Sequence, residues 1–144
     1  MKKQLTLIAI VLSILNACSS LPDGQSAQAI GSWQNIGNIH NNNITVAYDS
    51  GSIKKSGAVA SLRDRKIVND MSKENYINLP KYKTAIAEWD FHCINKTYQI
   101  KKAEFWDKNG QTLGTQTYTG NLYVAPANIV NNTPTERLFK IACK

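Results

Sequence analysis

Between Thr84 and Cys93 every second residue is apolar, while the residues between them are mostly polar or charged. A period of two is the spacing at which side chains fall on alternate faces of a β-strand. One face of this strand is therefore predicted to pack on a core while the other meets water, which is typical of an antiparallel sheet. The core-facing residues are Ala85, Ala87, Trp89, Phe91 and Cys93, and the opposite face carries Glu88, Asp90 and His92.

Similar short runs recur from about Gly31 onward, separated by clusters of Asn, Asp, Gly and Lys. These clusters are typical of turns, so we expect a meander of antiparallel strands. The clearest hairpin signal is Asn109-Gly110, because Asn and Gly tolerate the positive φ angles that a tight turn needs at both central positions. The strands are predicted near 32–38, 43–49, 59–68, 84–93, 97–106 and 112–122.

The last residues change from a period of two to a helical spacing. Thr133 offers a capping hydroxyl, Pro134 suits the first helical position, and Glu136 can reach back to the cap. The apolar residues that follow form one stripe, which predicts a short amphipathic helix. The expected fold is α+β, a single antiparallel meander sheet of about six strands with this C-terminal helix packed on one face. The stripe consists of Leu138, Phe139, Ile141, Ala142 and Cys143.

The chain begins with a basic stretch and an apolar run of 13 residues from Leu5 to Ala17. As a helix this run spans about 20 Å, short of the roughly 30 Å hydrocarbon core, so it is predicted to be a signal h-region and not an anchor. Leu15-Asn16-Ala17-Cys18 resembles the bacterial lipoprotein signal, in which the cysteine receives lipid. We expect a signal peptide at 1–17, a lipidated flexible tether at 18–30 and a domain at 31–144. The alternative is an ordinary secretory peptide with a chance cysteine.

Lipid on Cys18 would hold the protein at a membrane, since each buried CH₂ contributes about 0.8 kcal/mol. Ser19 follows the cysteine in place of an acidic residue, which is similar to the sorting preference for the outer membrane of bacteria with two membranes. The expected location is the outer membrane, with the cell surface favoured over the periplasmic face.

With Cys18 lipidated, Cys93 and Cys143 remain in a compartment that oxidises thiols. Cys93 ends the core-facing register of its strand and Cys143 lies on the apolar side of the helix, so a disulfide would tie the helix to the sheet. Closing a loop of about 50 residues should stabilise the fold by roughly 4 kcal/mol. A redox or metal site is disfavoured, because there is no C-x-x-C and neither His40 nor His92 makes a ligand spacing with the cysteines.

Motifs for catalysis are scarce. Glu88 and Asp90 share a strand face about 7 Å apart, a separation that suits an inverting glycosidase. The alternative that we favour is cross-strand pairing with Lys101 or Lys102 on the next strand. His92 could act as a base, but no nucleophile motif or phosphate-binding loop accompanies it. We expect no enzyme, no cofactor, no metal and no nucleic-acid partner.

The chain carries 17 Lys and Arg against 10 Asp and Glu. Without Lys2 and Lys3 of the signal peptide the balance is 15 against 10, or +5, which mildly favours an acidic partner. Strand-edge lysines that only prevent aggregation are the alternative for any one cluster. The candidate partner-binding surface is Lys54, Lys55, Arg63, Arg65, Lys66, Lys81, Lys83, Lys101 and Lys102. The aromatic residues that interleave with these charges, as in protein-binding patches, are Tyr76, Tyr82, Tyr98 and Trp106.

Together these features resemble the surface-adhesin E family of bacterial lipoproteins. The likeness covers about residues 31 to 144; the Tyr-Asp-x-x-Ser-Ile turn and the paired cysteines match well, whereas 124–130 match only loosely. After the lipoprotein signal, the residues that carry it are Trp33, the turn from Tyr48 to Ile53, Tyr82-Lys83, the strand from Glu88 to Cys93, Trp106-Asp107 and the segment from Pro134 to Cys143.

The resemblance implies a small antiparallel sheet with a C-terminal helix tied to it by a disulfide. It also implies a host-facing adhesin that binds extracellular-matrix or plasma proteins and that can form a homodimer through an exposed strand or sheet face. The alternative function is that of a periplasm-facing structural or assembly lipoprotein. An inhibitor of a cationic host enzyme such as lysozyme is disfavoured, because that inhibitor should be acidic.

Overall fold

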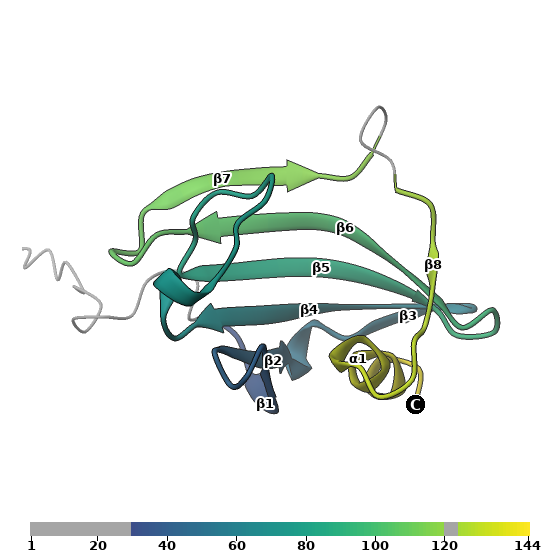
Figure 1. The fold of residues 1–144 in the computed structure, drawn as a ribbon. Coiled ribbons are helices and arrows are strands. Elements are labelled where there is room, and N and C mark those ends of the chain that lie inside the picture. The colour runs from purple at the N-terminus through teal and green to yellow at the C-terminus, as the bar shows by residue number, and fades with distance from the viewer. Residues whose placement is uncertain (1–29, 120–123) are drawn as a thin grey trace, which may run out of the picture.

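A computed structural model describes residues 30–119 and 124–144. Within them, one antiparallel sheet has the strand order β1-β2-β4-β5-β6-β7, a meander in which each strand lies beside the next long strand of the chain (Figure 1). Two short strands are added to it, β3 beside β4 and β8 beside β6. The strands are β1 Trp33–Ile39, β2 Ile44–Asp49, β3 Lys54–Ser56, β4 Val59–Val68, β5 Thr84–His92, β6 Thr97–Trp106, β7 Thr112–Thr117 and β8 Ala127–Asn128.

The six predicted strands are all present, and the single meander sheet with a C-terminal helix is confirmed. The sequence does not predict β3 or β8, because exposed segments of three and two residues are too short to show a period. The strand expected near 112–122 ends at Thr117, and residues 120–123 lie outside the described part of the chain.

The alternation in β5 decides which face of the sheet is buried. Trp89 and Phe91 stack on the predicted face with ring centroids 6.0 Å apart. Leu62 of β4 lies opposite Trp89, and Phe105 of β6 is buried on the same side. Ile86 is an exception to the simple pattern, because it lies on the opposite face and is nevertheless only 6% exposed.

The helix α1, Pro134–Ala142, covers one end of the buried face (Figure 1). Thr133 Oγ1 accepts a hydrogen bond from the backbone N–H of Glu136 at 3.1 Å, which confirms the predicted cap. The Glu136 carboxylate accepts a hydrogen bond from the N–H of Asn132, one residue before the cap, and not from the cap itself. The buried side chains of α1 are Leu138 and Ala142.

Two further contacts attach α1 to the sheet. The disulfide between Cys93 and Cys143 joins the end of the helix to the end of β5, as the sequence predicts, with Cα atoms 5.6 Å apart. Arg137 Nη1 donates a hydrogen bond of 2.7 Å to the carbonyl of Ile36 in β1. The helix therefore bridges the first and the fifth strands.

The loop between β4 and β5 covers the other end of the buried face. It contains a 3₁₀ turn, Met71–Lys73. Tyr82 contacts Phe105 with ring centroids 5.4 Å apart, and the Tyr76 hydroxyl donates to the Tyr82 carbonyl at 2.9 Å. Burial raises the pKa of both tyrosines above the usual value. Tyr82 is thus a core residue, and its assignment to a surface patch from the sequence is wrong.

The β6–β7 hairpin forms at the predicted Asn-Gly pair, but with a different turn. Gly110 has a φ of 78°, whereas Asn109 is not among the residues of positive φ. Asp107 Oδ1 accepts hydrogen bonds from the N–H groups of Asn109 and Gln111, both at 2.8 Å. The Asp107 N–H donates in turn to the Gln111 carbonyl at 2.9 Å. A three-residue loop closed by a left-handed glycine therefore replaces the expected two-residue turn.

Candidate binding surface

The helix α1 and the β4–β5 loop pack on the buried face, which leaves the opposite face of the sheet as the candidate surface. We call it the open face. β4 and β5 build its centre in register, with Ser61 opposite Asp90 and Arg63 opposite Glu88. It comprises Trp33, Asp49, Lys54, Ser61, Arg63, Arg65, Ile86, Glu88, Asp90, Lys101 and Lys102.

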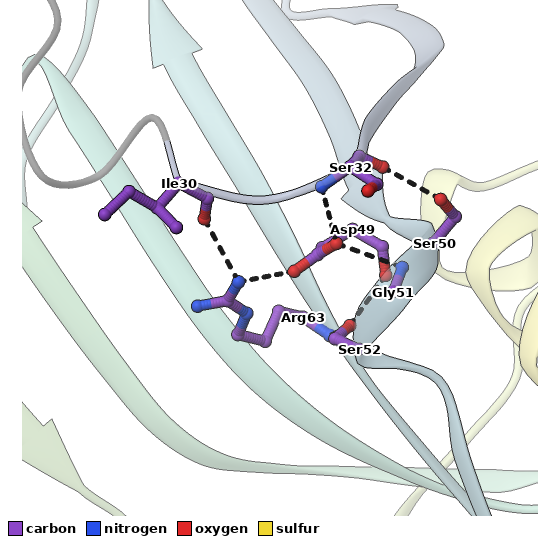
Figure 2. A network of polar contacts seen from close by, with 7 residues as sticks. All are labelled: Ile30, Ser32, Asp49, Ser50, Gly51, Ser52 and Arg63. Atoms are coloured by element: carbon purple, nitrogen blue, oxygen red, sulfur yellow. Dashed lines mark hydrogen bonds and ion pairs between the residues drawn. The ribbon is translucent and has the colours of Figure 1, made fainter.

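Asp49, the last residue of β2, organises one corner of the open face (Figure 2). Its Oδ1 accepts hydrogen bonds from the N–H of Ser32 at 2.9 Å and of Gly51 at 3.1 Å, and its Oδ2 pairs with the Arg63 guanidinium. Ser52 Oγ accepts a hydrogen bond from the Arg63 N–H at 2.8 Å and donates one to the Asp49 carbonyl at 2.7 Å. Arg63 is thus fixed at both its backbone and its head group.

The same contacts set the charge of Asp49. Burial by itself would raise the pKa of this carboxyl, because its side chain is only 6% exposed. The hydrogen bonds from Arg63 and from the backbone of Ser32 and Gly51 outweigh burial and hold the pKa below its usual value. Asp49 therefore remains ionised and cancels the charge of Arg63.

Arg65 is an open-face arginine that, unlike Arg63, makes no ion pair with a described acidic residue. Its guanidinium lies over the Trp33 ring, 4.5 Å from the centroid, and Arg63 lies over the same ring at 5.5 Å. Burial lowers the pKa of Arg65, and its Nε atom is buried without a hydrogen-bond partner. Among the described residues no ion pair involves Arg65. A planar guanidinium held on an aromatic ring is well placed to bind a carboxylate or sulfate.

A cavity of about 500 Å³ adjoins the Asp49 corner. Ser61 Oγ donates to Asp90 Oδ1 at 2.7 Å, and Lys101 Nζ lies 3.8 Å from Asp90 Oδ2. A β-bulge occurs at the point where Glu88 and Trp89 pair with β6. The polar and charged residues that line the cavity are Asp49, Ser52, Lys54, Ser61, Arg63, Glu88, Asp90 and Lys101.

The two carboxylates considered as a glycosidase pair have ordinary partners. Asp90 pairs with Lys101, which confirms the cross-strand interpretation. Glu88 lies opposite Lys102 in register, while the Lys102 ammonium pairs with Glu104. The hydrogen bond with Glu104 raises the pKa of Lys102, and the charge of Glu88 adds to this. These pairings of Glu88 and Asp90 with lysines favour a binding surface over a pair of catalytic carboxylates.

Five of the nine basic residues predicted for the binding surface meet on the open face. Lys66 does not, because it lies on the buried side of β4 and its Nζ donates to Asp64 Oδ2 at 2.5 Å. Asp64 is 0% exposed and also accepts a hydrogen bond from Trp89 Nε1 at 2.7 Å. The five residues on the open face are Lys54, Arg63, Arg65, Lys101 and Lys102.

The three remaining lysines are also separated from the open face. Lys83 Nζ donates to the carbonyls of Val68 at 2.5 Å and Asn69 at 3.1 Å, so it fastens the β4–β5 loop. Lys81 is exposed on that loop. Lys55 pairs with Ala60, a residue of the buried face, and therefore lies on the other side of β3 from Lys54.

Asp49 and Asp64 were not identified from the sequence as buried, ion-paired residues. The pattern along the chain contained a partial signal for each. The alternation that places Leu62 and Val68 on one side of β4 also places Asp64 there, between arginines that suggest a solvated run. Asp49 was visible only as part of a turn, because its partner Arg63 is 14 residues away in sequence.

Within residues 30–119 and 124–144 there is no group of three or more His, Cys, Asp or Glu residues able to hold a metal ion. In the same part of the chain, no helix has the length and apolar character needed to span a membrane.

Comparison with known proteins gives one family. The family model for surface-adhesin protein E matches residues 33–144. No curated protein and no solved structure matches the chain.

Proposed function

The chain belongs to the surface-adhesin protein E family, and from this membership we propose that it is an outer-membrane lipoprotein that binds host extracellular-matrix or plasma proteins through its open face. The observation that carries the proposal is the family match over residues 33–144, which includes every strand and the helix described above. Membership implies a surface adhesin without enzymatic activity.

The proposed anchor is lipid on Cys18, after removal of residues 1–17. The twelve peptide links from Cys18 to Ile30 can span at most about 40 Å, since an extended chain rises about 3.3–3.6 Å per residue. The first described residue lies beside the open face, because the Ile30 carbonyl accepts a hydrogen bond from Arg63 at 3.3 Å (Figure 2). This position supports a short connection between the membrane and the domain of residues 31–144.

The proposed contact chemistry is the recognition of an acidic partner. Arg65 provides a cation that forms no ion pair among the described residues, and its guanidinium lies over the Trp33 ring. On the same face, Lys101 pairs with Asp90 and Lys102 pairs with Glu104. Both lysines can exchange these ion pairs for ion pairs with acidic residues of a host protein. A second copy of the chain could pair at an edge strand, β1 or β7, and we include a homodimer in the proposal.

Protease shaving of intact cells that express the full chain tests the location. We expect loss of the domain from intact cells, and retention in cells that carry Cys18→Ala, whose chain lacks the anchor and stays in the periplasm. Permeabilised cells serve as the control for protease sensitivity. Protection of the wild-type domain until the cells are permeabilised would instead support the periplasm-facing structural lipoprotein.

The same cells test the open face through their adhesion to a basement-membrane extract and to immobilised plasma proteins. Arg65→Gln should weaken adhesion about tenfold, because a lost charge-assisted hydrogen bond costs about 1.5 kcal/mol. Lys81→Gln removes the same charge from the β4–β5 loop and should leave adhesion unchanged. Adhesion should also fall at high salt, since exposed charges are screened. Equal adhesion of wild type and Arg65→Gln would exclude Arg65 from the contact.

A further inference from the structure

One end of the sheet gathers segments that are distant in sequence. The disulfide joins Cys143 to Cys93 there, and the Cys93 N–H donates to the Ala58 carbonyl at 2.9 Å. The Ile129 N–H donates to the Lys96 carbonyl at 3.0 Å. Figure 1 shows β3, the β5–β6 turn and the end of α1 together at this end. We call it the disulfide tip, made of residues 53–59, 93–97, 127–131 and 141–144.

The disulfide tip combines exposed aliphatic side chains with unpaired positive charge. Ile94 is 79% exposed in the β5–β6 turn, and Val130, the residue after Ile129, is 63% exposed. The tip contains no Asp or Glu in the four segments that define it. Within the described part of the chain, no ion pair involves its lysines. These lysines are Lys54, Lys55, Lys96 and Lys144.

The opposite end of the sheet differs in its charges, although it also carries exposed aliphatic residues. Ile77 is 69% exposed on the β4–β5 loop. There, however, Asp70 pairs with Lys73 at 3.5 Å, and Asp107 sits at the start of the turn that contains Lys108. Lysines without an ion pair among the described residues, such as Lys81 and Lys108, occur at the opposite end as well, but there they lie among acidic residues. Within the described part of the chain, the disulfide tip therefore differs in having lysines around an exposed isoleucine without any Asp or Glu in its own segments.

We propose that the disulfide tip is a second membrane contact, in addition to the lipid anchor, and that it binds the surface of an anionic phospholipid bilayer. Ile94 would enter the interface between headgroups and acyl chains, while the surrounding lysines meet the lipid phosphates. A bilayer suits this geometry better than an acidic protein, because the tip presents isolated aliphatic residues on a projecting turn. Protein-binding patches are instead rich in aromatic residues and arginine, which the tip segments lack.

The path of the chain supports contact with the membrane that holds the anchor. The Ile30 carbonyl is hydrogen-bonded to Arg63, and Val59 at the tip lies four residues before Arg63 in β4, a distance of about 13 Å. With at most about 40 Å of chain between Cys18 and Ile30, the tip lies within reach of the same bilayer. Only this orientation depends on lipidation; the chemistry of the tip does not.

The test therefore uses the mature chain with Cys18→Ala, which carries no lipid. Sedimentation with phosphatidylcholine vesicles, with and without phosphatidylglycerol, should show binding only to the anionic vesicles. Ile94→Ser should weaken binding about tenfold, in line with the burial of one aliphatic side chain, and Lys54→Glu with Lys55→Glu should reduce it at least as much. The matched controls at the opposite end, Ile77→Ser and Lys108→Glu, should bind like the parent chain. Thermal unfolding of each variant checks that the fold is retained.

Three results would overturn the proposal. The first is a parent chain that does not sediment with anionic vesicles, and the second is an equal loss in tip and control variants. The third is binding that depends on the lysines but not on Ile94, which would identify a site for a soluble polyanion. None of these results affects the shaving experiment, so the proposed location and the membrane contact can fail separately.

Discussion

Asp49 shows at the scale of one residue how a buried charge is accommodated. Its carboxylate receives two backbone N–H groups and the Arg63 guanidinium, so its negative charge has a donor on each oxygen. A buried charge is costly without such partners, and removing one partner leaves the other charge uncompensated. Asp64 follows the same rule with Lys66 and Trp89.

Replacing Asp49 by Asn should lower the free energy of unfolding by about 1–3 kcal/mol at neutral pH, because Arg63 loses its charge-assisted partner. The pKa of Asp49 is lower in the folded chain than in the unfolded chain. Its stabilisation is thus present above the unfolded value of about 3.9 and is lost as the pH falls through the folded value. Urea unfolding of both proteins over this range is the measurement. A gap between them that stays constant at low pH would contradict the assignment.

Single residues also show what sequence reasoning could not reach. Trp89 and Phe91 were predictable as core because their own strand alternates. The position of Lys66 on the buried side follows from the same alternation, but its partner Asp64 was hidden in a charged run. The pairing of Trp33 with Arg65 depends on the register of β1, β2 and β4, which no local pattern specifies.

At the scale of elements, the long strands and the helix were predictable because each has a period and clear end signals. β3 and β8 were not, since they exist only where β4 and β6 offer a free edge. The turn of the β6–β7 hairpin was predicted at the right place with the wrong geometry, because the Asp107 side chain supplies hydrogen bonds that an Asn-Gly rule ignores.

The helix α1 depends on its links to the sheet. Nine residues are too few for a helix that is stable by itself. The Cys93→Ala, Cys143→Ala double variant should lose about 4 kcal/mol of unfolding free energy, as expected for opening a loop of 50 residues. Urea unfolding with and without reductant measures this. Cys18→Ala is the matched control and should unfold like wild type, whereas equal stability of the double variant would show that packing alone holds α1.

At the scale of the whole molecule, the sheet separates three tasks. Its buried face holds the core under α1 and the β4–β5 loop, its open face presents Arg65 and paired charges, and its disulfide tip presents Ile94 among lysines. The family and the meander could be predicted from the sequence, since both depend on patterns along the chain. The division of the basic residues between the faces could not, because it depends on which strands become neighbours.

Two sets of titratable groups with shifted pKa values set how the free energy of unfolding depends on pH. Carboxyls set the acid limit and buried tyrosines set the alkaline limit. Four carboxyls have pKa values held below normal by hydrogen bonds, so their contribution is lost as the pH falls through those lowered values. Tyr76 and Tyr82 have pKa values raised by burial, so their contribution is present below the normal value of about 10 and is lost as the pH rises through the raised values. The carboxyls are those of Asp49, Asp70, Glu74 and Glu136.

We therefore expect the urea midpoint to be nearly constant from about pH 5 to 9 and to fall on both sides of this range. On the alkaline side, tyrosinate absorbance should show Tyr76 and Tyr82 ionising late and together with unfolding. Tyr76→Phe should remove the hydrogen bond to the Tyr82 carbonyl and loosen the β4–β5 loop, so that Tyr82 ionises earlier. If Tyr76 and Tyr82 ionised near pH 10 in the folded protein, this loop could not cover the core as described.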